Sequence, residues 1–528
     1  MVCRCVAAAR QRPAARILAA LAAGAALALS LPPLDLLPAV AAYGVLLALA
    51  EASDDVVRRP LLARAVLGAA FGFAYHLAGL WWIGAAFLVD APTYGALLPF
   101  AVIGLPLVLA PFHGAALALA GLACGGPVVH AVGFAAALGL TEWIRSFAFT
   151  GFPWNVPAVQ LSGSLELAQA VSVVGLAGVT PLVVLLGAAP VLLLRGRRLA
   201  AGAILSGAAL VFVGGAVRLA QAPATDGPRV RIIQPAIPQR EKWDPAHAPQ
   251  IWRTLLALTA APAEEGARPG VVVWPETALP FLYRTPSAVQ AELIAALGGS
   301  TLITGTVEVE RGAGSDMVTN SIAVIGPDGI PLGRYDKAHL VPFGEYVPFA
   351  PLLERLGLTA LAGATADFTP GEATATLAVP GLPPARPLIC YEAIFPQAGV
   401  IQPAAWIVNV TNDAWFGDTP GPHQHLQLAV LRAIEAGTPI VRAANTGISA
   451  LIDAYGRVPD NLQLNRRDRL DVRVPQSVHT VYHQAPRAPI VVMTGLLLGL
   501  VARYYRRGRV RRARSVDGIR NARTAQLP

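Results

Sequence analysis

The feature that most constrains this chain is a series of apolar segments, each of the length that a helix needs to cross a bilayer, about 20 residues. They form two groups separated by a long stretch of mixed polar and apolar residues. Seven precede this stretch, at 17–31, 36–52, 63–89, 95–121, 128–148, 172–194 and 199–218, and one follows it at 488–503. The pattern predicts a polytopic α-helical membrane protein with about eight spans.

Composition agrees with this prediction, because 55% of the 528 residues are hydrophobic and 14% are charged, which is too apolar for an ordinary soluble enzyme. The stretch between the two groups is long enough for one inserted α/β domain. We therefore expect a membrane domain at 1–220, an extracytoplasmic domain at 225–480, and a last span with a basic tail at 485–528.

Arginine clusters predict the orientation, because short cytoplasmic loops collect Lys and Arg. The clusters are Arg4, Arg10, Arg12 and Arg16; Arg58, Arg59 and Arg64; and Arg195, Arg197 and Arg198. Because the chain changes sides of the membrane at each span, all three clusters fall on the same side. This places both termini in the cytoplasm and the inserted domain outside. Because further spans follow the first one directly, we interpret it as an uncleaved span and not as a secretory signal.

The net charge of +9 comes mostly from residues 503–528, which hold nine arginines and one aspartate. A basic tail beside a span is typical of an orientation signal that also contacts anionic lipid head groups. We therefore expect no nucleic-acid partner.

Cysteine usage singles out Cys390, the one cysteine between residues 225 and 480. Cys3 and Cys5 precede the first span, and Cys124 follows the fourth. A lone thiol in an oxidising compartment is a candidate nucleophile, because no partner there can form a disulfide with it. The alternative is a buried cysteine that packs as a small apolar side chain.

The inserted domain alternates short β-rich runs with helical patterns, which predicts a layered α/β fold. Helices are expected around 246–264, 286–298 and 423–437, and a hairpin at "GPDGIPLG". The expected strands are "VRIIQPAIPQ", "GVVVWPE", "TLITGTVEVE", "NSIAVIG", "ARPLICYE", "AAWIVNVTND" and "PIVRAANTG", with a further one containing Arg334 and Tyr335.

Three reactive side chains end predicted strands, where α/β folds gather their chemistry. Glu276 ends "VVVWPE", Lys337 follows the strand with Arg334, and Cys390 ends "RPLIC". A carboxylate, an ammonium and a thiol can serve as base, oxyanion stabiliser and nucleophile in acyl transfer through a thioester. Each of them alone is more often a solvated or a core residue.

The segments "WPE", "DKAHLVPFGEYVP" and "CYEAIFP" resemble the three catalytic blocks of the nitrilase, or carbon-nitrogen hydrolase, superfamily. Together with the spans, with "TEWIRSFAFTGFPWN" from Thr141 and with "TNDAWFGDTPGPHQHLQLAVLRAIEAGTPIVRAANTG" from Thr411, they resemble its membrane-bound branch, the bacterial apolipoprotein N-acyltransferases. The resemblance implies a nitrilase-like αββα sandwich. It covers nearly the whole chain except the extreme N-terminus and the arginine tail.

The resemblance implies that Glu276 is the general base, that Lys337 stabilises the oxyanion and that Cys390 is acylated. It also implies an auxiliary role for Glu345, with Tyr391 and Glu392 shaping the turn of the nucleophile. Trp243 matches a tryptophan near the family's site. The family's turn before "IPQ" usually carries glycine and asparagine, whereas this chain reads "QPAIPQ".

The family's reaction moves an acyl chain from a membrane phospholipid to the cysteine, and then to the α-amino group of S-diacylglyceryl cysteine in an apolipoprotein. The implied location is the bacterial inner membrane, with the catalytic domain in the periplasm, no cofactor, and a monomer favoured. We expect Trp415 and Phe416 to form an entrance loop for lipid, and Trp81 and Trp82 to belong to the interfacial aromatic belt.

Other polar residues have plainer interpretations. Glu142 and Arg145 lie three residues apart on one helical face, which predicts a structural ion pair. His423 and His425 lie near Asp413 and Asp418, yet two residues apart on a helix do not share a face, so we expect capping and hydrogen bonding there and no metal.

Three alternatives remain at the sequence level. A membrane-anchored amidase would use the same three side chains but release its acyl group to water, and seven preceding spans exceed that need. A transporter would explain the spans, although most lack the paired charges typical of transport. A structural scaffold would not require Glu, Lys and Cys in this order.

Overall fold

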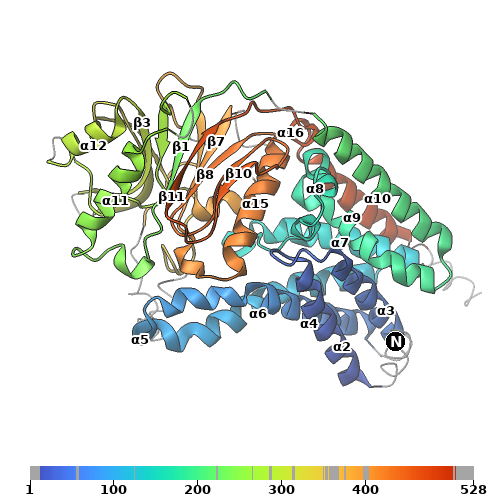
Figure 1. Cartoon of the computed structure of the whole chain (residues 1–528). Coiled ribbons are helices and arrows are strands. Elements are labelled where there is room, and N and C mark those ends of the chain that lie inside the picture. Colours follow the sequence, from blue (N-terminus) through green and yellow to red (C-terminus); the bar gives the residue numbers. More distant parts are fainter. Residues whose placement is uncertain are drawn as a thin grey trace, which may run out of the picture.

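The computed structural model consists of a helical N-terminal region, an α/β domain and a C-terminal helix, in this order along the chain (Figure 1). It describes residues 12–54, 59–123, 125–221, 224–263, 266–284, 288–311, 316–348, 350, 355, 368–373, 376–396, 404–503 and 506. Cys3, Cys5, Cys124, Arg4, Arg10, Arg58 and the tail after Arg506 lie outside the described residues.

The N-terminal region is built of apolar helices that pack on one another. Its helices are α2 (Pro13–Leu27), α3 (Ala42–Asp54), α4 (Pro60–Leu80), α5 (Ala91–Tyr94), α6 (Leu98–Ala120), α7 (Pro127–Arg145), α8 (Leu165–Ala168), α9 (Val171–Leu194) and α10 (Arg198–Leu219). Proline occupies the first turn of α2, α4, α6 and α7, where its missing N–H costs nothing.

Six helical segments are long and apolar enough to cross a membrane within the described residues, and they coincide with six of the predicted spans. They are Pro13–Ser30, Pro60–Leu88, Ala91–Ala120, Pro127–Arg145, Val171–Leu194 and Arg198–Leu219. The predicted spans at 36–52 and 488–503 correspond to the shorter apolar helices Leu37–Ala52 and Ala488–Arg503. The prediction of eight spans is therefore not confirmed, although all eight segments are helical.

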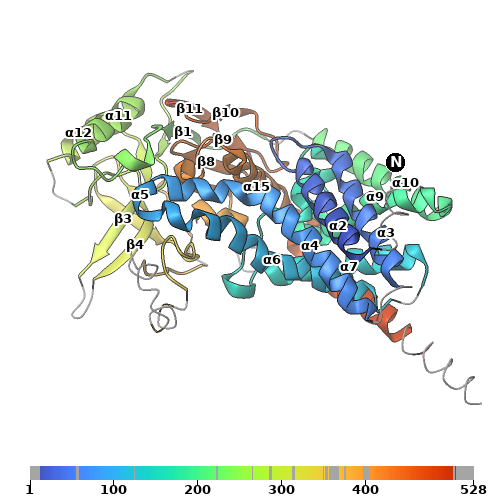
Figure 2. The same ribbon diagram turned by 90° about the horizontal axis from the view of Figure 1, so that it is seen from below.

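Helices α4 and α6 and the short α5 form an arm that lies below the α/β domain in Figure 1 and in front of it in Figure 2, which views the molecule from below. The 3-10 segment η3 (Trp81–Leu88) continues α4 into this arm. Close packing depends on glycine, because a Cβ on Gly68 would lie 2.6 Å from the carbonyl oxygen of His113 on α6. The arm brings aromatic side chains of the helical region to the α/β domain.

The α/β domain contains two sheets. The six-stranded sheet has the order β11-β1-β2-β3-β4-β5, and the five-stranded sheet has the order β10-β9-β8-β7-β6. The strands are β1 (Arg229–Gln234), β2 (Val271–Val273), β3 (Thr301–Glu310), β4 (Met317–Ile325), β5 (Pro331–Asp336), β6 (Ala385–Ile389), β7 (Trp406–Thr411), β8 (Ile440–Ala444), β9 (Ser449–Ile452), β10 (Asp460–Leu462) and β11 (Asp468–Arg473).

Strand directions put several carboxyl ends at one edge. In the first sheet β1, β2 and β3 are parallel, and β5 runs with them because β4 is antiparallel to both β3 and β5. In the second sheet β6, β7 and β8 are parallel. The predicted hairpin at "GPDGIPLG" is confirmed as the β4–β5 turn. Strands β9, β10 and β11 were not predicted.

Helices cover both outer faces of the paired sheets, as the predicted sandwich requires. Apolar residues from both inner faces pack together, among them Ile232, Val273, Val408 and Val441. On the outer face of the six-stranded sheet lie α11 (Ala248–Ala260) and α12 (Gln290–Leu297). The other sheet is covered by α15 (Pro420–Ala436).

Helix α15 also contacts the N-terminal helices, and its apolar residues Leu428, Leu431 and Ile434 belong to one core with those helices. It therefore lies between the five-stranded sheet and the helical region (Figure 1). The short α16 (Val481–Gln484) follows and contacts α9. One layer of the catalytic domain is thus shared with the membrane helices.

Candidate active site

The three predicted reactive residues follow strand ends at the edge where the two sheets meet. Glu276 lies three residues beyond β2, Lys337 follows β5 directly, and Cys390 follows β6 directly. All three are buried, with exposed fractions of 7%, 1% and 8%. The first two come from the six-stranded sheet and the third from the five-stranded sheet. Packing of the two sheets is therefore what brings them together.

Lys337 contacts two carboxylates. Its Nζ lies 2.8 Å from Glu345 Oε1 and 3.6 Å from Glu276 Oε1. Burial alone would lower the pKa of Lys337, but the Glu345 and Glu276 carboxylates outweigh it and raise the pKa above its usual value. Lys337 is therefore a permanent cation, suited to stabilise an oxyanion.

Asn320 on β4 joins the two carboxylates. Its Nδ2 donates to Glu276 Oε1 at 2.8 Å and to Glu345 Oε1 at 2.7 Å, and its backbone carbonyl accepts from the Lys337 amide. The second oxygen of Glu345 accepts from the Val341 amide at 2.8 Å. These bonds hold Glu345 against Lys337, whereas the carboxylate of Glu276 makes fewer hydrogen bonds. Glu345 is thus placed to orient the lysine, and Glu276 to exchange a proton.

The turn that carries Glu276 packs against Gly305 in the middle of β3. A Cβ at position 305 would lie 2.4 Å from the Thr277 amide nitrogen and 2.5 Å from the Glu276 Cα. The Ala278 amide donates to the Gly305 carbonyl at 2.9 Å. Glycine is thus required there, because the backbone after β2 lies directly on that strand.

Cys390 occupies a strained turn. Its φ is 48°, in the left-handed region that residues other than glycine rarely adopt. The Glu392 carboxylate fixes this turn by accepting from the Ile389 amide at 2.7 Å, the Ala338 amide at 2.9 Å and the Tyr335 hydroxyl at 2.8 Å. Glu392 therefore connects the turn of the nucleophile to the segment that follows Lys337.

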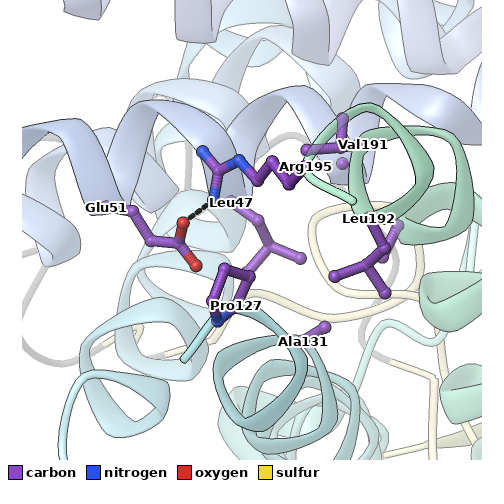
Figure 3. Close-up of a pocket in the computed structure, with 9 residues that line it drawn as sticks. Leu47, Glu51, Pro127, Ala131, Val191, Leu192 and Arg195 are labelled. Carbon is purple, nitrogen blue, oxygen red and sulfur yellow. Dashed lines mark ion pairs between the residues drawn. The ribbon is translucent and has the colours of Figure 1, made fainter. Parts of the chain in front are cut away.

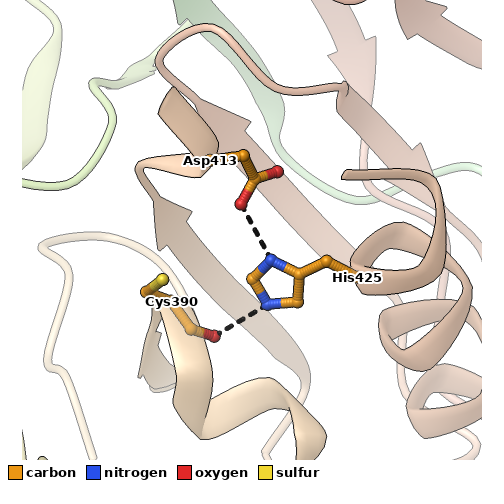
Figure 4. A group of neighbouring side chains, drawn as sticks. All are labelled: Cys390, Asp413 and His425. Carbon is orange, nitrogen blue, oxygen red and sulfur yellow. Dashed lines mark hydrogen bonds and ion pairs between the residues drawn. The ribbon is translucent and has the colours of Figure 1, made fainter. Parts of the chain in front are cut away.

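Asp413, His425 and Arg442 form a buried cluster. Figure 4 shows Asp413 and His425 beside Cys390. His425 Nδ1 lies 2.8 Å from Asp413 Oδ1, its Nε2 lies 3.2 Å from the Cys390 carbonyl oxygen, and Arg442 donates to Asp413 Oδ2 at 2.8 Å. Burial would raise the pKa of Asp413, but Arg442 and His425 lower it to about 2.

Cys390, Asp413 and His425 offer ligand atoms within 4.8 Å of one another, a spacing that a metal ion could use. Both nitrogens of His425 already have hydrogen-bond partners, and the Arg442 guanidinium pairs with Asp413. This donor set fits a hydrogen-bonding cluster that supports the nucleophile's backbone. The predicted hydrogen bonding of His425 is confirmed, whereas the helix cap is Thr419, whose hydroxyl accepts from the Gly421 amide.

The segment 148–155 of the helical region reaches the nucleophile's turn. The Tyr391 hydroxyl donates to the Gly151 carbonyl at 2.8 Å, and His339 Nε2 lies 2.9 Å from the Thr150 carbonyl. The predicted pair of Glu142 and Arg145 is confirmed, and Arg145 also donates to the carbonyls of Phe152 and Trp154. Tyr391 is thus bonded to the membrane domain as well as to the catalytic turn.

Gln424 on α15 links the domains a second time. Its Oε1 accepts from the indole of Trp82 at 3.1 Å and from that of Trp154 at 3.0 Å. Phe416 packs on both rings, with a centroid distance of 4.7 Å to Trp82. Trp82 is 2% exposed, so its predicted place in the interfacial belt is wrong, because the α/β domain covers it.

The predicted substrate-binding residues differ in exposure. Trp243 is 54% exposed and Trp415 is 43% exposed, while Phe416 is half-buried against Trp82. Trp415 and Phe416 belong to η9 (Asp413–Phe416), directly beyond Asp413. Large exposed apolar side chains beside a buried site suit contact with lipid.

Sequence reasoning missed Asn320, Lys242 and Gln424. Asn320 lies in a strand that is otherwise buried and mostly apolar, and a polar residue at such a position is a signal that was available. Lys242 lies next to Trp243 in "REKWDP", and the sequence does not reveal that it is buried. Gln424 had no visible signal, because its partners lie more than 250 residues away.

A small cavity elsewhere in the molecule contains none of these residues (Figure 3). It lies between α3, α7 and α9, where Glu51 pairs with Arg195, and its walls include Leu47, Pro127 and Leu192. All its lining residues come from the helical region. The reactive side chains therefore lie outside it.

Comparison with known proteins agrees with the resemblance. The family "Apolipoprotein N-acyltransferase N-terminal domain" matches residues 23–189, and "Carbon-nitrogen hydrolase" matches residues 229–480. The apolipoprotein N-acyltransferase of Brucella melitensis is 44% identical over 482 residues, covering 87% of this chain and 90% of the relative. That of Rhodopseudomonas palustris is 39% identical over 506 residues, covering 92% and 94%. A solved amidase from Nesterenkonia is 22% identical, with a TM-score of 0.34, over 50% of this chain and 95% of its own.

Proposed function

The chain belongs to the apolipoprotein N-acyltransferase family, and we propose that it acylates lipoproteins through a thioester at Cys390. It is a membrane-bound acyltransferase with a lipid donor and a lipoprotein acceptor. In our proposal the donor is a membrane phospholipid, and the acceptor is the α-amino group of an S-diacylglyceryl cysteine. The observation that carries this is the buried contact of Lys337 with Glu276 and Glu345 beside the one thiol of the domain.

In the first half-reaction Glu276 takes the thiol proton while the sulfur attacks the carbonyl carbon of the phospholipid ester. The Lys337 ammonium and the Tyr391 amide donate to the resulting oxyanion. The intermediate collapses by breaking the ester C–O bond, and Glu276 returns the proton to the leaving oxygen. A lysophospholipid departs, and the acyl group remains on sulfur.

In the second half-reaction the neutral α-amine attacks the thioester carbonyl. Glu276 accepts a proton from the nitrogen, and the same donors stabilise the second oxyanion. The C–S bond then breaks, an amide forms, and the proton on Glu276 returns to sulfur. Because the first product leaves before the second substrate reacts, the kinetics are ping-pong.

The auxiliary residues act on this chemistry indirectly. Glu345 orients Lys337, and Glu392 with Tyr391 shapes the turn of Cys390, in agreement with their hydrogen bonds. Trp243, Trp415 and Phe416 contact the acyl chains of the substrates. The reaction needs no cofactor, metal or nucleic acid, and one chain contains every group it uses.

A labelling experiment tests the thioester. The purified enzyme is incubated with phospholipid carrying a labelled acyl chain and no acceptor, and the label is located by mass spectrometry. We expect a hydroxylamine-sensitive adduct on the peptide containing Cys390, absent in Cys390→Ala and present in the matched control Cys124→Ala. Acyl transfer to an amine that persists in Cys390→Ala would contradict the covalent mechanism, and transfer to water alone would support an amidase.

For location we propose the bacterial inner membrane, with the catalytic domain in the periplasm and both termini in the cytoplasm. The support is the arginine pattern, because Arg195, Arg197 and Arg198 join α9 to α10. Reporter fusions check this proposal. A reporter active only in the cytoplasm should fail after Ala350 and work after Val510, and the reverse result would contradict the orientation.

A further inference from the structure

Lys242 is a second buried lysine at the candidate active site. It follows the 3-10 turn η7 (Gln239–Glu241), is 5% exposed, and donates from Nζ to the backbone carbonyl of Glu276 at 2.9 Å. We propose that Lys242 is a second cation of the active site, whose charge offsets the carboxylates around Cys390 and promotes ionisation of the thiol. This inference rests on the proposed function of Cys390 as the nucleophile.

The charges around Lys337 do not balance without Lys242. Two carboxylates, Glu276 and Glu345, contact one ammonium, so this group carries a net negative charge. Asp413 does not alter the count, because Arg442 pairs with it. A buried excess of negative charge opposes the formation of a thiolate and then of an oxyanion. Glu392, a further buried carboxylate at the turn of Cys390, accepts from the Tyr335 hydroxyl and the Ile389 amide. One further cation at this place therefore reduces the buried excess of negative charge.

Lys242 has the position and the donors for this role. The titratable groups that interact electrostatically with its ammonium are Glu276, from the turn after β2, and Cys390, from the turn after β6. An ammonium has three N–H donors. Among the described residues, its side chain makes one hydrogen bond, to the Glu276 carbonyl. The remaining donors are free to face the negative charge that develops during the reaction.

The loop before Lys242 is fixed by the opposite sheet. Asn445, beyond β8, accepts from the Ile237 amide at 2.9 Å and donates to the Ile237 carbonyl at 2.8 Å. Asn412, beyond β7, donates to Gln239 Oε1 at 2.6 Å. Lys242 is thus held from the sheet that carries Cys390 while it bonds to Glu276 on the other sheet. These hydrogen bonds fix the loop that buries Lys242 at the candidate active site.

The charge of Lys242 can also change near neutral pH. Burial lowers its pKa from 10.5 to about 8, although Glu276 and Cys390 act in the opposite direction. Below that pH the side chain is charged and offsets the carboxylates. Above it the charge is lost, and the buried excess of negative charge increases. The effect of Lys242 on the thiol should therefore disappear as pH rises.

The test measures alkylation of Cys390 by iodoacetamide, a small neutral reagent, in the full-length enzyme in detergent between pH 6.5 and 10. Peptide mass spectrometry gives the rate. At pH 7 we expect Lys242→Met to react roughly tenfold more slowly than wild type, which is the order expected for one nearby charge at intermediate dielectric constant. The ratio of the two rates should approach one above about pH 9, where wild-type Lys242 is uncharged.

Two further variants make the result specific. Arg240→Met removes a cation from the same turn at an exposed position and should leave the rate unchanged at every pH. Lys242→Arg keeps its charge and should exceed wild type only above pH 8, which preserves the test if Lys242→Met fails to fold. A ratio that does not vary with pH, or an equal effect of Arg240→Met, would overturn the proposal.

Alkylation needs no acyl donor. The proposed thioester function and the proposed role of Lys242 can therefore be contradicted independently of each other. If wild type forms no thioester with phospholipid while alkylation shows the expected pH dependence, the proposed function is wrong and the role of Lys242 stands. If the thioester forms and the alkylation ratio is constant, Lys242 only braces the Glu276 turn.

Discussion

At the scale of single residues, the proposed nucleophile is a thiol at rest. Burial raises the pKa of Cys390 to about 12, Glu276 acts in the same direction, and Lys337 opposes them. Very little thiolate therefore exists at neutral pH, in contrast to enzymes that lower the pKa of a reactive cysteine. In the proposed mechanism a base must therefore take the proton during the attack. Glu276 suits this role, because its carboxylate makes fewer hydrogen bonds than that of Glu345.

We predict that Lys337→Met slows formation of the acyl-enzyme by about a hundredfold or more, because it removes an oxyanion donor. The same change leaves Glu345 and Glu276 buried without the ammonium that contacts both carboxylates, and it should lower stability. The double variant Lys337→Met/Glu345→Gln separates these effects. Its unfolding temperature should recover while its acylation rate stays low. Recovery of both would show that Lys337 serves stability alone.

Ala236 shows how this chain tolerates its departure from the family's turn. In "QPAIPQ" the alanine adopts a φ of 51°, a conformation that suits glycine and asparagine, the two residues expected in this turn. The Ala236 amide donates to the Asn445 carbonyl at 3.1 Å, next to the two bonds between Asn445 and Ile237. The loop keeps its shape because Asn445 holds it from the other sheet.

Ala236→Gly should therefore stabilise the protein by up to about 1 kcal/mol, because it removes the Cβ from a left-handed residue. The matched control is Ala257→Gly on the exposed face of α11, which should destabilise by about 0.5–1 kcal/mol. Thermal unfolding of both variants measures these stability changes, which should have opposite signs. A loss of stability in Ala236→Gly would mean that strain in this turn is negligible.

At the scale of secondary-structure elements, strand β3 acts as a template for the turn that carries the base. Gly305 lies at its centre, and the Glu276 turn rests on it through bonds in both directions, from Gly305 to the Pro275 carbonyl and from Ala278 to the Gly305 carbonyl. Thr277 in this turn has a φ of 45°. The strand thus positions Glu276 by backbone contact and not by side chains.

Gly305→Ala should displace Glu276 and lower the acylation rate by about a hundredfold, since small misplacements of catalytic groups cost about that much. On β5, in the same sheet, Gly333→Ala is the matched control, because a Cβ there would meet nothing within 4 Å. Thioester formation with labelled phospholipid compares the two. Equal activities would show that the turn can move away from β3 without cost.

At the scale of the whole molecule, the membrane and catalytic domains are joined next to the chemistry. Gln424 bonds two indoles of the helical region, and the following residue, His425, contacts the carbonyl of Cys390. On the other side of the nucleophile, Tyr391 bonds Gly151. The turn of Cys390 is therefore held at a fixed position relative to the helices that contact lipid.

We predict that Gln424→Leu lowers acylation by phospholipid in vesicles by about tenfold, because the two domains no longer hold their relative position. Iodoacetamide should still alkylate Cys390 at close to the wild-type rate. The control Gln427→Leu removes the same group from a half-buried position three residues further along α15 and should retain activity. An equal loss in both assays would place the defect in the nucleophile's turn itself.

The sequence by itself determined the apolar segments, the eight predicted strands of the inserted domain and the strand-end positions of Glu276, Lys337 and Cys390, because hydropathy and turn signals act over a few residues. It did not reveal the burial of Lys242, the bridging by Asn320 or the covering of Trp82. These depend on contacts between residues far apart in the chain, such as the bond between Gln424 and Trp82. Burial and charge balance are properties of the packed molecule, so only the tertiary structure decided which polar residues share the site.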